Sequence, residues 1–199
     1  METKMKPAGK IGWLNLLKPG DIGLIHNHNF FAWLQNLRRK KYREGDLQAN
    51  HGFYISNPPE IIEANGMFVK KANIIKNIGD KTECWVFRNL NLDPNQLQAM
   101  LAFADGAVES GGRYSVGGII QFGLQYLGIK KKISDEAGVF CTEFTSRIID
   151  AGGLPYITKL KPFEIAPSYQ LNWFLGAEAK SEGWYLAAHY IPNGKFFVS

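Results

Sequence analysis

The chain has 199 residues, a length typical of one domain, and its apolar content of 45% supports a hydrophobic core without disulfide staples. Charged residues make up 21% and aromatic residues 13%, which excludes the composition of a disordered protein. Lysine and arginine outnumber aspartate and glutamate by 23 to 18, a net charge of +5. No segment has the ~20 consecutive apolar residues that a membrane-spanning helix needs.

The N-terminal region predicts a cytoplasmic protein. Residues 1–10 are polar, and the apolar stretch after them is interrupted by Gly12 and Asn15, so it is too short and too polar for a secretory signal. The chain contains two cysteines, Cys84 and Cys141. One disulfide could join them, but they do not form the disulfide framework of a small secreted domain.

The first predicted element is a buried strand at residues 21–25, which follows the turn signal Lys18-Pro19-Gly20. Residues 26–50 then mix histidines, aromatic residues and a basic run. The apolar positions between Phe30 and Leu37 have helical spacing, which indicates a short amphipathic helix. We interpret residues 26–50 as a lid or an insertion within a single domain that spans residues 1–199.

Most of the positive surplus lies in one short run of the chain, at Arg38, Arg39, Lys40, Lys41 and Arg43. Such a run can contact phosphates or an anionic surface. A solvated loop or helix end is the simpler interpretation, because no motif that reads RNA or DNA accompanies it. We therefore expect no specific nucleic-acid partner.

A strand-rich region comes next, with the patterns of a hairpin and of further strands. His51–Ser56 and Glu60–Ala64 read as paired strands around the turn Asn57-Pro58-Pro59. Residues 67–75 are expected to extend the sheet, and residues 84–88 form another strand candidate, in which Cys84 reads as inert core.

The second half of the chain is helical in texture. Asp93 and Pro94 have the pattern of an N-cap followed by proline at the first helical position. Further helices are expected at residues 119–126 and 140–150. Residues 162–175 are interpreted as a helix start or a loop, and a closing strand is expected at 184–191. Strands followed by helices and a final strand predict an α+β domain with an antiparallel sheet.

Cys141 is the candidate nucleophile, because it stands at the start of the helix predicted for residues 140–150. The unpaired backbone N–H groups and the dipole at a helix N-terminus stabilise a thiolate, which is the reactive form of cysteine. The same N–H groups can bind the oxyanion of an acyl transition state. A single cysteine is, however, more often a small buried hydrophobe.

His51 and Glu63 are the candidate base and its orienting carboxylate. An odd number of residues in the hairpin loop places them on one face of the sheet. They are then directly opposite if the loop is 56–58, or diagonal neighbours if it is 57–59. An even loop would separate them. A carboxylate that orients an imidazole toward a thiol is the arrangement of a catalytic triad.

Other residues are weaker candidates for a functional role than Cys141, His51 and Glu63. Tyr114 lies in a glycine-rich loop and is a candidate donor to substrate or oxyanion, although a core-lining tyrosine is about as common. His26 and His28 share a face of an extended chain, and Asp21 lies nearby, but a third ligand with metal-site spacing is missing. Nucleotide-binding and zinc-protease motifs are absent from the sequence, and we expect no cofactor and no metal.

Several short segments, taken in order, resemble a known family. They are Lys18-Pro19-Gly20-Asp21-Ile22, Asn50-His51-Gly52-Phe53-Tyr54-Ile55, Ile62-Glu63-Ala64, Tyr114, Phe140-Cys141-Thr142-Glu143-Phe144 and Pro162-Phe163-Glu164-Ile165-Ala166-Pro167-Ser168. Their order is similar to that of the circularly permuted NlpC-type papain-fold cysteine hydrolases, the YaeF- and YiiX-like group. The similarity covers roughly residues 18–170.

The resemblance implies a permuted papain-like fold in which Cys141 is the nucleophile, His51 the base and Glu63 the orienting residue, with Tyr114 matching a family tyrosine. It implies a cysteine-dependent hydrolase or acyltransferase that acts on an amide, ester or thioester bond of a peptide, lipid or acylated small molecule. The alternative is a catalytically inactive module on the same fold that binds a lipid, cell-wall or protein ligand.

Overall fold

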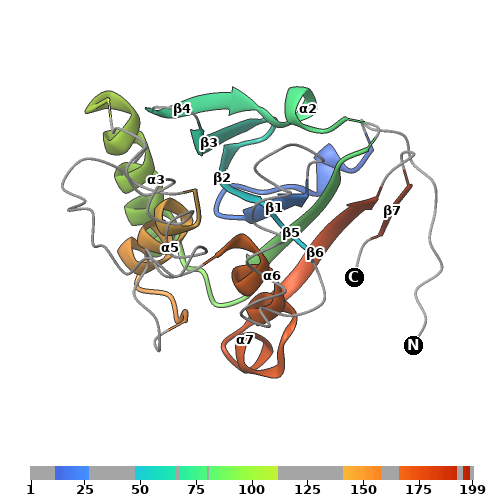
Figure 1. Ribbon diagram of the computed structural model, residues 1–199. Helices are drawn as coiled ribbons and strands as arrows, with labels where there is room; N and C mark the ends of the chain where they lie inside the picture. The colour runs from blue at the N-terminus through green and yellow to red at the C-terminus, as the bar shows by residue number, and fades with distance from the viewer. Residues whose placement is uncertain are drawn as a thin grey trace, which may run out of the picture.

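One antiparallel sheet runs through the middle of the molecule (Figure 1). The computed structural model describes residues 12–26, 48–65, 68–79, 81–111, 141–157 and 166–191, and the backbone of residues 195–197. The sheet has seven strands in the order β4-β3-β2-β1-β5-β6-β7, and each neighbouring pair is antiparallel. The predicted α+β class with an antiparallel sheet is therefore confirmed.

The described elements follow the sequence patterns closely. The strands are β1 (Ile22–His26), β2 (His51–Asn57), β3 (Glu60–Asn65), β4 (Phe68–Asn73), β5 (Glu83–Asn89), β6 (Trp184–Ile191) and β7 (Lys195–Phe197). The helices are the short 3-10 turn η1 (Leu14–Leu16), α2 (Ile74–Asn77), α3 (Pro94–Glu109), α5 (Cys141–Ala151), α6 (Pro167–Leu175) and α7 (Ala177–Ser181).

One strand boundary differs from the sequence prediction, and three short elements were not predicted. The strand expected at residues 67–75 ends at Asn73, and the chain turns at once into helix α2. The Asn73 side chain accepts a hydrogen bond from the Ile75 backbone N–H at 2.9 Å, so an N-cap ends the strand. The prediction missed α2, α7 and β7, each of which is too short to show a clear periodic pattern.

The sheet is covered on both faces, and its strands alternate between two hydrophobic clusters. On β2, Tyr54 belongs to the cluster beneath the helices α3, α5, α6 and α7, whereas Phe53 and Ile55 belong to a second cluster that includes Trp13 before η1 and Ile74 of α2. Successive side chains of a strand point to opposite faces. The alternation explains why β2 reads as a continuous apolar run rather than as an amphipathic strand.

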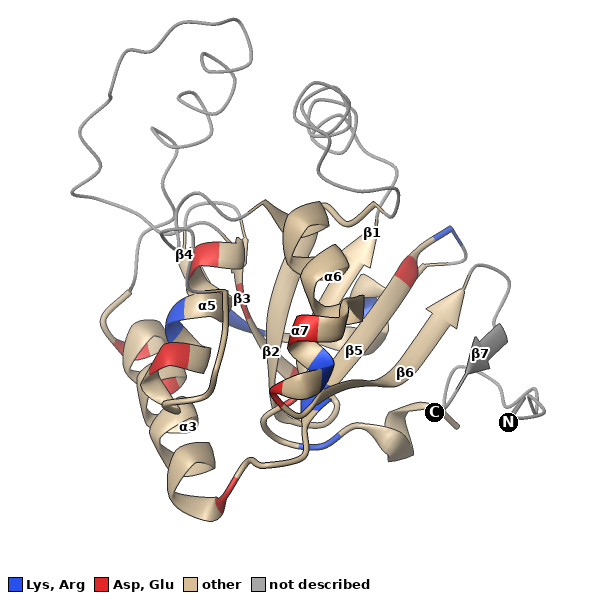
Figure 2. Cartoon of the chain, turned by 90° about the horizontal axis from the view of Figure 1, so that it is seen from below, with Lys and Arg blue, Asp and Glu red and all other residues tan. Residues whose placement is uncertain are grey.

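Figure 2 looks onto the face that the longer helices cover. Helices α3 and α5 pack on the β2–β4 half of the sheet, and α6 and α7 pack on β6. Helix α3 begins at the predicted position, where the Asp93 side chain accepts the backbone N–H groups of Asn95 and Gln96. Gln96 accepts the Asp93 N–H in return, which completes a capping box.

The β2–β3 hairpin sets the relative position of His51 and Glu63. Pro58 and Pro59 form a two-residue turn, which alone would be an even connection, but a bulge between Ile55 and Asn57 restores the odd register. As a result Phe53 lies opposite Glu63, and His51 is the diagonal neighbour of Glu63 on the same face. The diagonal arrangement considered from the sequence is the one observed.

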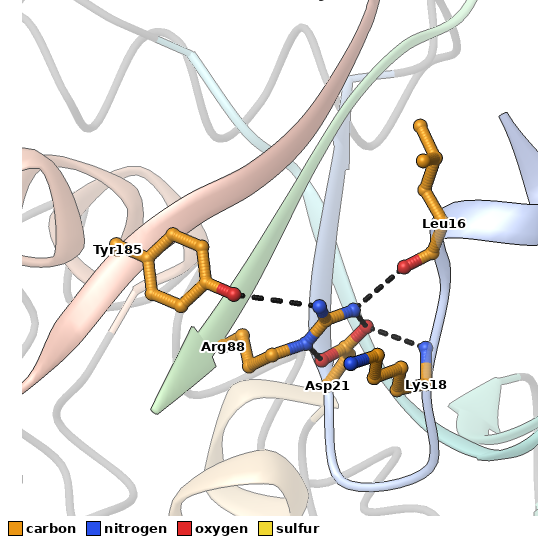
Figure 3. A network of polar contacts seen from close by, with 5 residues as sticks. All are labelled: Leu16, Lys18, Asp21, Arg88 and Tyr185. Carbon is orange, nitrogen blue, oxygen red and sulfur yellow. Dashed lines mark hydrogen bonds and ion pairs between the residues drawn. The ribbon is translucent and has the colours of Figure 1, made fainter. Parts of the chain in front are cut away.

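A buried ion pair holds the start of β1 (Figure 3). The Arg88 guanidinium of β5 contacts both carboxylate oxygens of Asp21, with Nε at 2.7 Å and Nη2 at 2.8 Å. Arg88 also donates to the Leu16 carbonyl and to the Tyr185 hydroxyl, and the Lys18 backbone N–H donates to Asp21. Asp21 therefore ties the N-terminal segment to the middle of the sheet.

The close packing of β1 against β2 predicts opposite effects for two glycine-to-alanine changes. An alanine Cβ at Gly23 would lie 2.1 Å from the ring of buried Phe53, whereas one at Gly106 of α3 meets no atom within 4 Å. We expect Gly23→Ala to destabilise the fold by about 1–3 kcal/mol through overpacking. Gly106→Ala should stabilise it by about 0.4–1 kcal/mol because alanine loses less backbone entropy. Urea unfolding measures both changes, and equal midpoints for the two variants would contradict the packing.

Candidate active site

Cys141 is the first residue of α5, as the sequence predicts, and only 4% of it is exposed. The apolar side of the helix, which includes Phe144, Ile148 and Ile149, packs into the core and fixes the helix axis. The helix stops at Ala151, and Gly153 adopts a φ of 64°, which favours glycine in a helix C-cap. The helix thus presents the thiol beside the first residues of β2, His51 and Gly52.

The thiol of Cys141 receives several donors. It shares a hydrogen bond with the His51 ring, and the backbone N–H groups of Gly52 and Thr142 point to the sulfur. Burial raises the pKa of Cys141, but the hydrogen bond and the positive charge of His51, with these two N–H groups, lower it overall. The local structure therefore favours the thiolate.

His51 is the first residue of β2 and bonds to two partners. Its Nε2 lies 2.9 Å from Oε2 of Glu63, which leaves Nδ1 for the thiol of Cys141. Burial lowers the pKa of His51, but hydrogen bonds to Cys141 and Glu63, and their negative charges, raise it overall. The imidazolium form is therefore stabilised between a thiolate and a carboxylate.

Glu63 lies in the middle of β3, and its side chain is 1% exposed. Besides His51, it accepts hydrogen bonds from the amides of Asn65 and Asn77, and Lys70 Nζ lies 3.8 Å from Oε1. Burial raises the pKa of Glu63, whereas the hydrogen bond and charge of His51, and then Asn65 and Lys70, lower it overall. A buried carboxylate with this many donors remains ionised.

A buried polar network supports the α5 helix from behind. Gln170 of α6 donates to the hydroxyls of Thr145 and Tyr156, and the Tyr156 hydroxyl also shares a hydrogen bond with that of Ser146. Thr145 and Ser146 in turn donate to the carbonyl of Thr142, the residue after the thiol, so in the contact between Ser146 and Tyr156 the tyrosine hydroxyl is the donor. These hydrogen bonds fix the relative position of α5 and α6, because a shift would leave buried polar groups without partners and reduce the stability of the fold.

A second contact fixes the backbone just before His51. The Ser168 hydroxyl of α6 donates to the Ala49 carbonyl at 3.0 Å and accepts the Ala49 N–H at 3.3 Å. Both backbone groups of a residue two positions before His51 are thereby fixed. Ser168 therefore fixes the segment of the chain that leads into β2.

The other candidates have different outcomes. Cys84 is a free thiol that is fully buried, and burial raises its pKa. Its place in the core agrees with the interpretation from the sequence. Asp21 is engaged by Arg88, and the described residues contain no group of three or more potential metal ligands. Tyr114, His28 and the basic run Arg38, Arg39, Lys40, Lys41 and Arg43 lie outside the described residues, as does most of the segment 26–50.

Among the helices that the structure describes, none combines the length and the apolar character needed to cross a membrane. Comparison of the sequence with protein-family models and with curated proteins finds no match.

Sequence reasoning missed the residues that hold Glu63. Asn77 lies in α2, a four-residue helix that begins inside the strand expected at residues 67–75 and ends beyond it, so no predicted element contained Asn77. Asn65 precedes Gly66, and this pair is typical of a turn rather than of a side chain that binds a carboxylate. An isolated amide carries no periodic signal, so only the tertiary contacts reveal it.

Proposed function

We propose that this protein is a cysteine-dependent hydrolase or acyltransferase in which Cys141, His51 and Glu63 act as a catalytic triad. We further propose that its α+β domain is a permuted papain-like fold of the NlpC type, in line with the ordered motifs of the sequence. One observation carries the proposal: a single imidazole bonds both to a thiol at a helix start and to a buried carboxylate.

The physical support is that each group has the environment its role needs. A nucleophilic thiol needs a lowered pKa. The hydrogen bond and charge of His51, followed by the N–H groups of Gly52 and Thr142, lower the pKa of Cys141 against the effect of burial. A base needs a fixed ring orientation, which the 2.9 Å contact with Glu63 provides for His51.

The reaction follows from these positions. The sulfur of Cys141 attacks the carbonyl carbon, and the C=O π electrons move to the oxygen, where N–H groups at the start of α5 stabilise the charge. The His51 imidazolium then gives its proton to the leaving nitrogen, oxygen or sulfur as that bond breaks. A thioester on Cys141 remains, and His51 is neutral.

The second half of the reaction releases the acyl group and restores the free enzyme. Neutral His51 takes a proton from water, or from another acceptor, as its oxygen or nitrogen attacks the thioester. The C–S bond breaks, the sulfur leaves as thiolate beside the new imidazolium, and the acyl group departs. An amide, ester or thioester of a peptide, lipid or acylated small molecule fits this sequence.

The alternative is a binding module without chemistry for a lipid, cell-wall or protein ligand. Such a module would tolerate a thiol that faces the core, far from the imidazole. The hydrogen bond between Cys141 and His51 is the opposite arrangement, so the geometry favours the enzyme.

A thiolate-directed activity probe tests the proposal, and the chain offers a matched control in its other cysteine. We expect the probe to label Cys141 in the wild type and in Cys84→Ala, and to leave Cys141→Ala unlabelled, as mapped by mass spectrometry. The same three proteins are then screened against peptide, lipid-ester and thioester substrates. Full hydrolysis by Cys141→Ala, or equal labelling of that variant, would refute the mechanism.

A further inference from the structure

We infer that Asn77 is a positioning residue of this site, which holds the Glu63 carboxylate in the orientation that His51 requires. The inference rests on the proposed function, because it assigns Asn77 a task within the triad. Its basis is geometric: Asn77 Nδ2 lies 3.0 Å from Oε2 of Glu63, the same oxygen that His51 Nε2 contacts at 2.9 Å.

The two oxygens of Glu63 have different surroundings. Oε1 accepts a longer hydrogen bond from exposed Asn65 at 3.2 Å, and the ammonium of Lys70 is 3.8 Å away. Oε2 has the two shorter contacts, one to the imidazole and one to Asn77. Asn77 is therefore the donor best placed to stop the carboxylate from turning away from His51, because a carboxylate with only one fixed donor can rotate about its last bond.

The amide of Asn77 is itself held in place by its helix. Ile74 and Ile78 of this segment are buried in the second hydrophobic cluster. The Ile74 backbone N–H donates to the Pro59 carbonyl at 3.0 Å, in the turn between β2 and β3. Helix α2 is thus anchored on the same hairpin that carries His51 and Glu63, so Asn77 keeps its distance from the carboxylate.

A structural role alone would give a different result from a positioning role. If Asn77 only completes α2, its loss changes stability and leaves the pH dependence of the thiol unchanged. If Asn77 fixes Glu63, its loss favours the neutral carboxyl group, because a donor to a carboxylate stabilises the charged form. The imidazolium then has a weaker counterion, and the thiolate of Cys141 forms only at higher pH.

The experiment measures the alkylation rate of Cys141 by iodoacetamide as a function of pH, in full-length protein with Cys84→Ala as background. We expect Asn77→Leu to move the acid limb of the profile upward by roughly 0.5–1 pH unit. Asn77→Asp should move it in the same direction, because two adjacent carboxyl groups share a proton and Glu63 is then no longer a fully ionised partner of His51. Asn77→Gln retains an amide donor, so its acid limb should move less than that of Asn77→Leu.

Lys76→Leu is the matched control, since Lys76 is an exposed neighbour on the same helix. The pH profile of this variant should coincide with that of the Cys84→Ala background. Rates are compared well below the thermal midpoint of each variant, so that unfolding does not contribute. Profiles of Asn77→Leu and Asn77→Asp that coincide with the background overturn the inference, as does an equal displacement in Lys76→Leu.

The outcome also separates this inference from the proposed function. If no substrate is hydrolysed but Asn77→Leu still displaces the profile, the positioning role stands and the enzymatic proposal fails. If hydrolysis is found and depends on Cys141, while the Asn77 profiles do not move, the enzyme proposal stands and the positioning role is wrong.

Discussion

Replacing His51 by glutamine is expected to remove most of the reactivity of Cys141 at neutral and acidic pH. Burial by itself raises the pKa of Cys141, and the hydrogen bond and charge of His51 are the leading effects that lower it. Without the imidazolium, the pKa of the thiol should rise. Since each unit of pKa is a tenfold change in thiolate at pH values below it, alkylation at pH 6 should slow by about a hundredfold.

The pH dependence has a definite sign. In the wild type the thiolate is paired with the imidazolium, so the alkylation rate should already be high at pH 6 and change little toward pH 8. In His51→Gln the rate should rise steadily with pH through that range. Hydrolysis should fall further, by about a thousandfold or more, because the variant also lacks the acid and base of the reaction.

The chain contains a matched control for this substitution. His189 on β6 bonds through Nε2 to Oε1 of Glu83 at 2.8 Å, and its ring stacks on Trp85, so it is a second imidazole–carboxylate pair in the same sheet. His189→Gln should leave the alkylation profile of Cys141 unchanged. A displaced profile in His189→Gln, or an unchanged one in His51→Gln, would contradict the role given to His51.

Replacing Arg88 by methionine is expected to destabilise the fold by about 3–5 kcal/mol near neutral pH, because it strands the buried carboxylate of Asp21 without its counterion. Only 1% of the Asp21 side chain is exposed, and Arg88 makes two of its contacts, at 2.7 and 2.8 Å. The Lys18 backbone N–H would be the donor that remains to Asp21. Denaturant unfolding measures the loss.

The loss should shrink as the pH falls. Burial already raises the pKa of Asp21 above its usual value, although Arg88 and the Lys18 N–H oppose the rise. Without Arg88 the pKa rises further, so the folded state binds a proton more readily than the unfolded state. Stability then decreases as pH rises through the interval between the unfolded and folded pKa values, and returns on acidification.

A double substitution separates charge from packing. Asp21→Asn combined with Arg88→Met removes both charges, so it should be more stable at pH 7 than Arg88→Met alone and should show less recovery at pH 5. A single variant as stable as the wild type, or a double variant with the same loss and the same pH dependence, would show that the ion pair is not what holds β1.

The candidate triad could be predicted only in part from local patterns in the sequence. A cysteine at a helix start could be found from the sequence, because helix boundaries have caps and periodicity that depend on nearby residues. The pairing of His51 with Glu63 could only be narrowed to alternatives, since it depends on the parity of one turn. The bulge between Ile55 and Asn57 decides that parity, and no periodic pattern in the sequence indicates it.

The sequence by itself determined the α+β class, the main strands and helices, and the identity of a thiol, an imidazole and a carboxylate that could act together. Tertiary structure alone decided that the imidazole contacts both partners, that Arg88 meets Asp21, and that Asn77 reaches Glu63 from a four-residue helix. The physical reason is that periodicity and caps arise between neighbours in the chain. Hydrogen bonds of buried polar groups join residues whose distance is set by the whole fold.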